Sequence, residues 1–563
     1  MGTLTASVVE AFLHDHQIPV FVENGAATLH KNDPSVPYDV SMDWPEASHY
    51  SDDKPSLMSS PPGAQHGDRT SPPPGFAHEL PPREESGQER GEDHTSIKML
   101  PTNALLQIFY FYLNDKHAKR SDWYTLARVS RQWRDIVISS RLLGAQLVYT
   151  GSRGMREIPL LLPIAIEQGN WDDDDGTLRA DNIAALLNSK HRDRVRTIDL
   201  VGLPKSLWEK IAAVMEMPFP ELESVTVWLA DYDGPTLPRS FLGGSAPRLR
   251  ILSLHGIQIP GMLAFSAKNL VRLFLLNMPD LAYISLQALF TSLSAMTHLK
   301  QLVLTFQSPR FPLTYRYPRL RPNLTSRLPP PLTPLVLPAL TSLTFQGVCE
   351  YLEEFVAQTH APLLRYLSVH LFVNIHVDVP GLYQFISGAE ELTKSDRATV
   401  HFSQHSTRFV VSSTTGLHER PMLEFVISSR EPSRQLSSLA KICRSLIPPF
   451  STLRYLRLLD DVRFPRNWKD DADGNEWLEL LDPFISVNEL YLSREIALRV
   501  WLALNDPASK RVANVLPALE SLIFEGHEPS GRVKELVGRF VAARQLLGQP
   551  VVVGISEKED DEE

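Results

Sequence analysis

The chain has 563 residues but only two cysteines, Cys349 and Cys443. So few thiols exclude a disulfide framework and fit a reducing compartment. They also exclude a zinc site, which needs clustered Cys and His ligands. Both cysteines lie in largely apolar contexts, GVCEYL and KICRSL, so we expect buried thiols rather than reactive ones.

Long hydrophobic runs are also missing. The longest, residues 158–166, has nine residues and two prolines, whereas a membrane helix needs about 20 apolar residues. The first 26 residues lack a basic start and are interrupted by Glu10, His14 and Asp15, unlike a signal peptide. We therefore predict no membrane segment and a location in the cytoplasm, the nucleus or both.

The chain has no excess of positive charge and no familiar catalytic motif. Its formal net charge is −10, which argues against a general nucleic-acid binder because such proteins neutralise phosphates with Lys and Arg. A phosphate-cradling glycine loop, a Gly-x-Ser-x-Gly motif and a His-Glu-x-x-His motif are all absent from the sequence. We predict a non-enzymatic protein that needs no cofactor and binds other proteins.

Two acidic stretches have the carboxylate density of a calcium loop: WDDDDG at residues 171–176 and KDDADG at residues 469–474. Neither has the required register. With Gly176 or Gly474 as the sixth position, the twelfth is Asn182 or Leu480, where a bidentate Glu is needed. We predict no metal site.

Residues 100–143 are predicted to form helices. Apolar residues recur there at intervals of three and four in two stretches, as on one face of a helix: Leu105, Ile108, Phe109 and Tyr112, then Leu126, Val129, Trp133 and Ile136. The first helix should begin near Thr102 or Asn103, just after Pro101. The second stretch, after the polar break NDKHAKRSD, fits one helix or two short ones.

The order of these residues resembles the F-box. The matching residues are Leu100-Pro101, Leu105-Leu106, Ile108-Phe109, Leu126, Val129-Ser130, Trp133-Arg134 and Ile136. Three features depart from the family. The break between the helices has a few extra residues, Ser130 stands where many members have Cys, and no Trp follows Leu143. The longer break between the helices would affect how the module contacts a partner.

The resemblance implies a three-helix module that docks on the Skp-type adaptor of an SCF ubiquitin ligase, through which cullin and a RING subunit are recruited. An F-box protein performs no bond chemistry itself. The residues that match the family's adaptor-contacting positions are Leu100, Pro101, Leu105, Ile108, Phe109, Leu126, Val129 and Trp133. Residues 97–145 are therefore interpreted as an F-box-like domain.

Composition divides the rest of the chain. Residues 1–30 form a short segment to which we assign no role. Residues 31–96 are rich in Pro, Ser, Gly and acidic residues, which predicts a disordered linker. Residues 146–550 are interpreted as the folded body, and residues 551–563 as a C-terminal end with the acidic tail EKEDDEE.

The body repeats one short pattern, in which two residues separate the first two apolar positions and one residue separates the last two. It starts at Val195, Leu222, Leu249, Leu270, Leu299, Leu340, Leu364, Leu453, Val487 and Leu519. The first four steps between these starts are 27, 27, 21 and 29 residues, as in leucine-rich solenoids. The pattern resembles leucine-rich repeats, although the family's Asn or Cys after the strand is missing.

We therefore predict an irregular α/β solenoid of strands with returning helices or loops. The alternative is a mixed globular domain whose strands share a consensus by chance. The stepping fails over residues 364–453, where residues 401–402 and 422–427 are expected strands. It also fails at residues 308–338, a proline-rich insertion whose Arg316, Arg319 and Arg321 are candidate contacts for an acidic or phosphorylated segment.

Alternation along the strands predicts which side chains face away from the core. If Val225 and Val227 point inward, then Ser224, Thr226 and Trp228 point outward. By the same alternation, the later strands should expose His255, Arg272, Phe274, Thr305, Gln346, Tyr366 and His370. Aromatic and basic side chains are typical of interface hot spots, so the candidate partner contacts are Trp228, His255, Arg272, Phe274, Tyr366 and His370.

The sequence thus predicts an F-box substrate receptor that binds the Skp-type adaptor through its helical module and an unknown target protein through its repeats. Two alternatives remain open. One is an adaptor-binding scaffold without a ubiquitinated client. The other is a leucine-rich-repeat interaction protein whose first helices only cap the solenoid.

Overall fold

The computed structural model describes most of the second half of the sequence and parts of the first. The described residues are 100–113, 123–140, 147–151, 163–169, 171, 175–231, 234–259, 267–279, 285–307, 334–372, 379–404, 406–413, 420–428, 432–446, 452–460, 474–505, 515–526 and 531–556. They all belong to one of the two units into which the chain divides, residues 94–563.

Several sequence-based interpretations fall outside the described residues. These are the segment 1–30, the linker 31–96, the acidic residues 172–174 and 469–473, the insertion arginines Arg316, Arg319 and Arg321, and the acidic tail 557–563. They stay predictions.

Three short helices follow Pro101: α2 (Thr102–Leu113), α3 (Trp123–Val129) and α4 (Arg131–Ser139). The expected start at Thr102 is confirmed, and the second stretch is two helices. Ser130 caps α4, since its Oγ accepts a hydrogen bond of 3.1 Å from the backbone N–H of Trp133. The rings of Phe109 and Trp133 pack with their centroids 4.6 Å apart and join α2 to α4.

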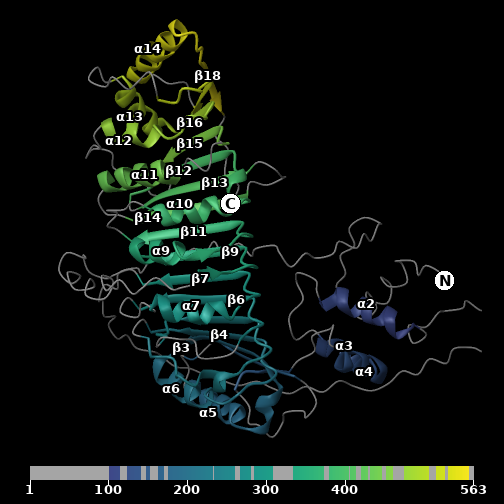
Figure 1. Ribbon diagram of the computed structural model, residues 1–563. Coiled ribbons are helices and arrows are strands. Elements are labelled where there is room, and N and C mark those ends of the chain that lie inside the picture. The colour runs from purple at the N-terminus through teal and green to yellow at the C-terminus, as the bar shows by residue number, and fades with distance from the viewer. Residues whose placement is uncertain are drawn as a thin grey trace, which may run out of the picture. The chain divides into compact units, whose positions relative to one another are not determined.

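Within the described residues, sixteen strands of the body form a single sheet (Figure 1). Its strands are, in chain order, β1 (Leu147–Tyr149), β2 (Ile164–Gln168), β3 (Val195–Leu203), β4 (Ser224–Leu229), β5 (Ile251–His255), β6 (Arg272–Met278), β7 (Gln301–Phe306), β9 (Ser342–Gly347), β11 (Tyr366–Phe372), β12 (Arg397–Phe402), β13 (Ser406–Ser413), β14 (Arg420–Ser428), β15 (Tyr455–Asp460), β16 (Glu489–Leu492), β17 (Ser521–Glu525) and β18 (Val552–Ser556). A separate two-stranded sheet pairs β8 (Leu335–Val336) with β10 (Thr359–His360).

Helices return along one side of the sheet (Figure 1). They are α5 (Gly176–Leu187), α6 (Lys205–Val214), α7 (Leu286–Ser294), α9 (Cys349–Val356), α10 (Pro380–Ser387), α11 (Pro432–Leu446), α12 (Gly474–Leu481), α13 (Arg494–Leu504) and α14 (Arg532–Leu546). Their apolar side chains and those of the strands form one continuous core from Tyr149 to Val551. The body is therefore α/β with a long, mainly parallel sheet, which is consistent with a leucine-rich-repeat solenoid.

The repeated sequence pattern has a clear structural basis. Its first apolar residue closes a turn, because its N–H donates to the carbonyl three residues earlier: Leu249 to Ala246, Leu270 to Ala267, Leu299 to Met296, Leu340 to Leu337 and Leu364 to Ala361, at 3.1–3.2 Å. The last two apolar residues lie in the strand and point into the core, as the alternating burial of β4 and β9 shows. These five units thus start with the same turn and bury the same positions.

The region without the repeat pattern is a three-stranded meander whose strands lie in the sheet in the reverse of their chain order. Strand β13 is antiparallel to both of its neighbours, β12 and β14. The sheet order there runs β11-β14-β13-β12-β15. The expected strands at residues 401–402 and 422–427 are confirmed within β12 and β14. Strand β13 was not predicted. Its buried residues are Thr407, Phe409, Val411 and Ser412, and none of them is the leucine that marks the other strands.

If the meander is an integral part of the core, then Phe409→Ala should destabilise the chain. Phe409 is fully buried in β13, and removing such a ring costs about 3–5 kcal/mol. We expect a lower urea midpoint. Val410→Ala, which changes the half-buried neighbour on the opposite face of the strand, is the matched control and should shift the midpoint far less. Equal shifts would contradict this placement of β13.

Candidate protein-interaction surfaces

The eight residues predicted to contact an adaptor divide into two groups in the three-helix module. Leu105, Phe109, Leu126 and Trp133 are buried, so in this structure their side chains hold the helices together. Leu100 and Ile108 are half-buried, whereas Pro101 and Val129 are exposed. Only the second group presents side-chain surface to a partner.

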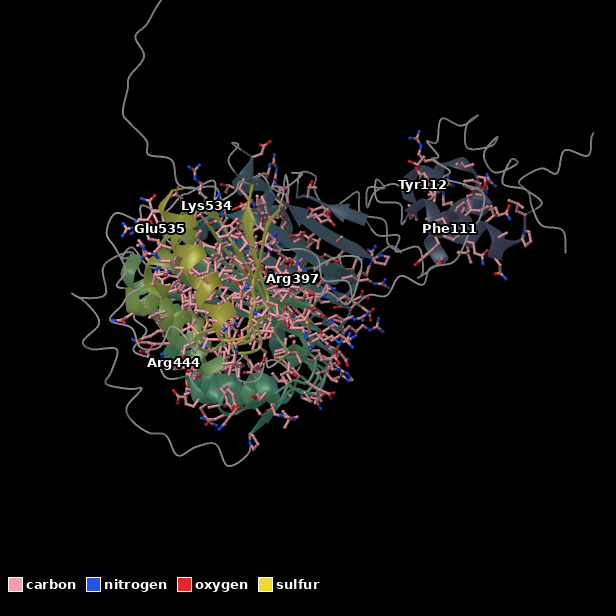
Figure 2. All side chains as sticks on the ribbon, turned by 90° about the horizontal axis from the view of Figure 1, so that it is seen from above. Phe111, Tyr112, Arg397, Arg444, Lys534 and Glu535 are labelled. Carbon is pink, nitrogen blue, oxygen red and sulfur yellow. The ribbon has the colours of Figure 1, made fainter. Side chains whose placement is uncertain are left out.

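The module also exposes aromatic side chains that sequence reasoning did not select. Tyr110 is 43% and Phe111 is 61% exposed on α2, and Val129 on α3 is 39% exposed. Figure 2 labels Phe111 and its neighbour Tyr112 on this part of the chain. The run FYFYL at the end of α2 contains the signal, since five successive apolar residues cannot all face one side of a helix. Exposed apolar surface of this kind is typical of a protein contact.

Register in the sheet brings the predicted partner contacts onto one open face, opposite the helices. Arg272 pairs with Gln301, and Tyr366 pairs with Ser342 in the same row. Phe274 lies one row further along the strands, and His370 lies beyond Tyr366 on β11. Three steps in the sheet order separate β6 from β11. The candidates therefore share a face without forming one cluster.

The expectation that His255 is exposed is wrong, because this residue is only 8% exposed. It pairs with the exposed Trp228 on β4, with the ring centroids 4.7 Å apart. Both ring nitrogens are buried without a hydrogen-bond partner in the described part of the chain. Burial lowers the pKa of His255 to about 4, so the ring is neutral at physiological pH and offers no positive charge.

A polar cluster surrounds Glu424 on β14, whose side chain is 14% exposed. The carboxylate accepts hydrogen bonds from Arg408 Nε at 2.6 Å, Tyr366 Oη at 3.1 Å and Ser368 Oγ at 3.2 Å. Sequence reasoning found Tyr366 but missed Arg408 and Glu424, because the meander that carries them was not recognised. This network satisfies a largely buried charge.

The same environment determines how the neighbouring side chains titrate. Burial, and then the charge of Glu424, raises the pKa of Tyr366 to about 12. Burial lowers the pKa of His370, although the charge of Glu424 opposes this. His370 Nε2 and Ser428 Oγ share a hydrogen bond of 2.6 Å. Tyr366 and His370, the two predicted partner contacts in this cluster, are therefore uncharged residues of the open face.

Two arginines of the open face stack on tyrosine rings in the C-terminal part of the sheet. The guanidinium carbon of Arg397 lies 5.1 Å from the ring centroid of Tyr455, and that of Arg457 lies 4.6 Å from the centroid of Tyr491. Figure 2 labels Arg397. Such stacking restrains the guanidinium group.

The two thiols of the chain lie in the core of the sheet body. Both cysteines are buried and unpaired. Burial, followed by the charges of Glu350 and Glu353, raises the pKa of Cys349 to about 12, and burial raises the pKa of Cys443 as well. In the part of the chain that the structure describes, three or more His, Cys, Asp or Glu residues never gather into a possible metal site. No described helix is long and apolar enough to cross a membrane.

Comparison with known proteins leaves the family of this chain open. No protein-family model matches the chain, and no curated protein matches it. Among solved structures, it is similar to the leucine-rich repeat-containing protein LegL7 from Legionella pneumophila. The two share 14% sequence identity with a TM-score of 0.23, over 61% of this chain and 95% of that one. The description of the body as a parallel, repeat-built sheet therefore depends on its own turns and registers.

The shifted pKa of Tyr366 predicts a dependence of stability on pH. The folded chain holds this phenol proton to about pH 12, whereas the unfolded chain releases it at about pH 10. The stabilisation is thus complete below about pH 10 and is lost as the pH rises towards about 12. When the difference in phenolate absorbance between wild type and Tyr366→Phe is plotted against pH, its midpoint should lie near pH 12. A midpoint near pH 10 would contradict the buried contact with Glu424.

Proposed function

We propose that this chain is a non-catalytic F-box substrate receptor of an SCF-type ubiquitin ligase. In this proposal the three-helix module binds the Skp-type adaptor, and through it cullin and the RING subunit. The sheet binds an unknown target protein. The proposal includes a location in the cytoplasm or nucleus, which fits two buried thiols that form no disulfide.

The observation that carries the proposal is the apolar surface of a module that already has its own core. Leu105, Phe109 and Trp133 supply that core, and they are separate from the continuous core of the sheet. Phe111 and Val129 are nevertheless exposed on the helices. A module of about 45 residues buries too little apolar surface to be very stable alone, so an apolar partner would stabilise it. The order of its residues, which resembles the F-box, supports the Skp-type adaptor as that partner.

The mechanism in this proposal is proximity. Residues on a rigid sheet hold the target, and the module tethers the same chain to the ligase. Tethering raises the effective concentration of a target lysine near the charged conjugating enzyme. The chain itself then needs no reactive group, which agrees with the raised pKa values of its two buried thiols.

Adaptor capture tests the proposal, provided that the variant keeps its fold. Substitutions at Phe109 or Trp133 would unfold the module, because both side chains are in its core. The better variant is Ile108→Glu with Val129→Glu, which places charges on the half-buried and exposed apolar positions. We expect purified wild-type chain to bind the Skp-type adaptor, and this variant to bind at least about thirtyfold more weakly, as for hot-spot residues worth roughly 2 kcal/mol.

Gln107→Glu with Gln132→Glu is the matched control, because it adds the same two charges at exposed polar positions of α2 and α4. It should bind like the wild type. Failure of the well-folded wild-type chain to bind any Skp-type adaptor would sink the proposal and leave a repeat protein with a helical cap. Adaptor binding without any ubiquitinated client in cells would instead support a scaffold.

A further inference from the structure

A continuous row of backbone hydrogen bonds runs along the amino-terminal edge of the sheet, where strands β3 to β11 begin. Each residue in this strand-start row donates its N–H to the carbonyl of the preceding one, at 2.8–2.9 Å. The row consists of Arg196, Glu223, Arg250, Val271, Lys300, Thr341 and Arg365. Its members are thus held in register by the sheet itself.

From Arg250 onward, positively charged and uncharged residues alternate from one strand of this row to the next. Arg196 and Glu223 pair with each other, with the guanidinium and carboxylate atoms 3.8 Å apart. Beyond them, Arg250, Lys300 and Arg365 occupy every second strand and are all exposed. Uncharged Val271 and Thr341 separate them. The row therefore presents three cations in a chain whose net charge is −10.

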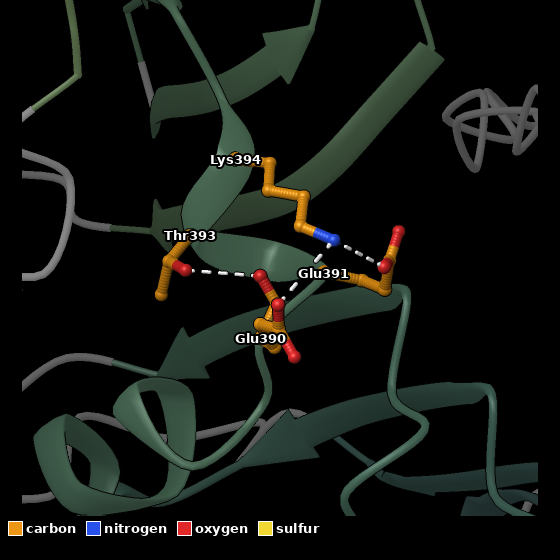
Figure 3. A network of polar contacts seen from close by, with 4 residues as sticks. All are labelled: Glu390, Glu391, Thr393 and Lys394. Atoms are coloured by element: carbon orange, nitrogen blue, oxygen red, sulfur yellow. Dashed lines mark hydrogen bonds and ion pairs between the residues drawn. The ribbon is translucent and has the colours of Figure 1, made fainter.

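Within the part of the chain that the structure describes, the side chains of Arg250 and Lys300 make no hydrogen bond or ion pair. The neighbouring acid is already used, since Glu221 pairs with Arg248. Arg365 is near Glu391, but Lys394 holds that carboxylate at 2.7 Å and also lies 3.7 Å from Glu390 (Figure 3). The hydrogen bond from Lys394, with Arg365 contributing, lowers the pKa of Glu391.

The spacing of the three cations matches the repeat distance of a polyproline II segment. Two strand steps of about 4.8 Å place neighbouring cations about 10 Å apart. A polyproline II segment has three residues per turn and rises about 3.1 Å per residue, so its side chains return to the same face about every 9 Å. Carboxylates at every third residue of such a segment would face Arg250, Lys300 and Arg365 in turn.

We propose that the strand-start row binds an acidic segment of a partner protein, held in a polyproline II conformation with Asp or Glu at every third residue. A short helix is a poorer candidate because isolated helices of this length are marginal in water. Nucleic acid is also a poorer match, because duplex DNA carries a charge about every 1.7 Å and would leave most phosphates unpaired along this row. Assigning the segment to a ubiquitination target rests on the proposed ligase function, whereas the binding itself does not.

Fluorescence anisotropy at low salt tests the proposal on the full chain. The probe is a labelled peptide of three Glu-Pro-Pro repeats, which cannot form a helix. A peptide of the same composition with its three glutamates adjacent tests the spacing. We expect the repeat peptide to bind more tightly than the second peptide, and added salt to weaken its binding.

The decisive variant is Arg250→Gln with Lys300→Gln and Arg365→Gln. Its control, Arg239→Gln with Lys441→Gln and Arg532→Gln, removes the same number and types of exposed cations elsewhere. Three exposed ion pairs should together be worth about tenfold or more in affinity, so the row variant should lose about that much while the control variant binds like wild type. Adaptor capture by the row variant should be unchanged, which separates this proposal from the adaptor proposal.

Three results would overturn the proposal. One is equal affinity of wild type and row variant for the repeat peptide, including no binding by either. Another is tighter binding of a single-stranded or duplex oligonucleotide that the row variant loses, which would make nucleic acid the ligand. The third is peptide binding that appears only in a chain ending at Ser556, because the acidic residues 557–563 would then be the occupant of the row.

Discussion

The structure depends on the hydrogen-bond ladder between parallel strands and on the core that this ladder aligns. Where strands β5 to β11 begin, the carbonyl on the preceding strand accepts from two N–H groups of the next strand. Arg250, for example, accepts from Val271 at 2.8 Å and from Arg272 at 2.9 Å. This double acceptance sets the register of every following side chain. Leucines such as Leu252 and Leu273 then meet in the core, and no repeat could bury its inner face without its neighbours.

The same register explains the surfaces. Residues outside the core fall into rows because the strands are aligned, and each row has its own chemistry. Trp228 packs against a neutral His255, and Glu424 accepts hydrogen bonds from three donors on two strands. At the strand starts, the side chains of Arg250 and Lys300 are exposed and make no hydrogen bond or ion pair within the described residues. Chemical differences between rows need no change in the backbone, so a repeat-built sheet can acquire a binding surface one residue at a time.

Sequence reasoning predicted the regular repeats well because one pattern determines both the turn and the buried positions. In the meander it predicted parts of β12 and β14 but missed β13, where Thr407 and Phe409 replace the marker leucines. It also missed the reversed strand order. It also expected His255 to be exposed, because alternation predicts the side of the sheet and not the cover that Trp228 supplies. The cluster of Glu424 with Arg408 and the row of Arg250, Lys300 and Arg365 needed the strand order and register, which the sequence does not contain.

Amide hydrogen exchange by mass spectrometry tests most directly the claim that one ladder and one core run through the body. The account predicts slow exchange in strands β2 to β18, with strands β12, β13 and β14 of the meander as well protected as β7 and β11 on one side and β15 on the other. Rapid exchange confined to strands β12, β13 and β14 would contradict it, because the sheet would then be two shorter solenoids without a shared core.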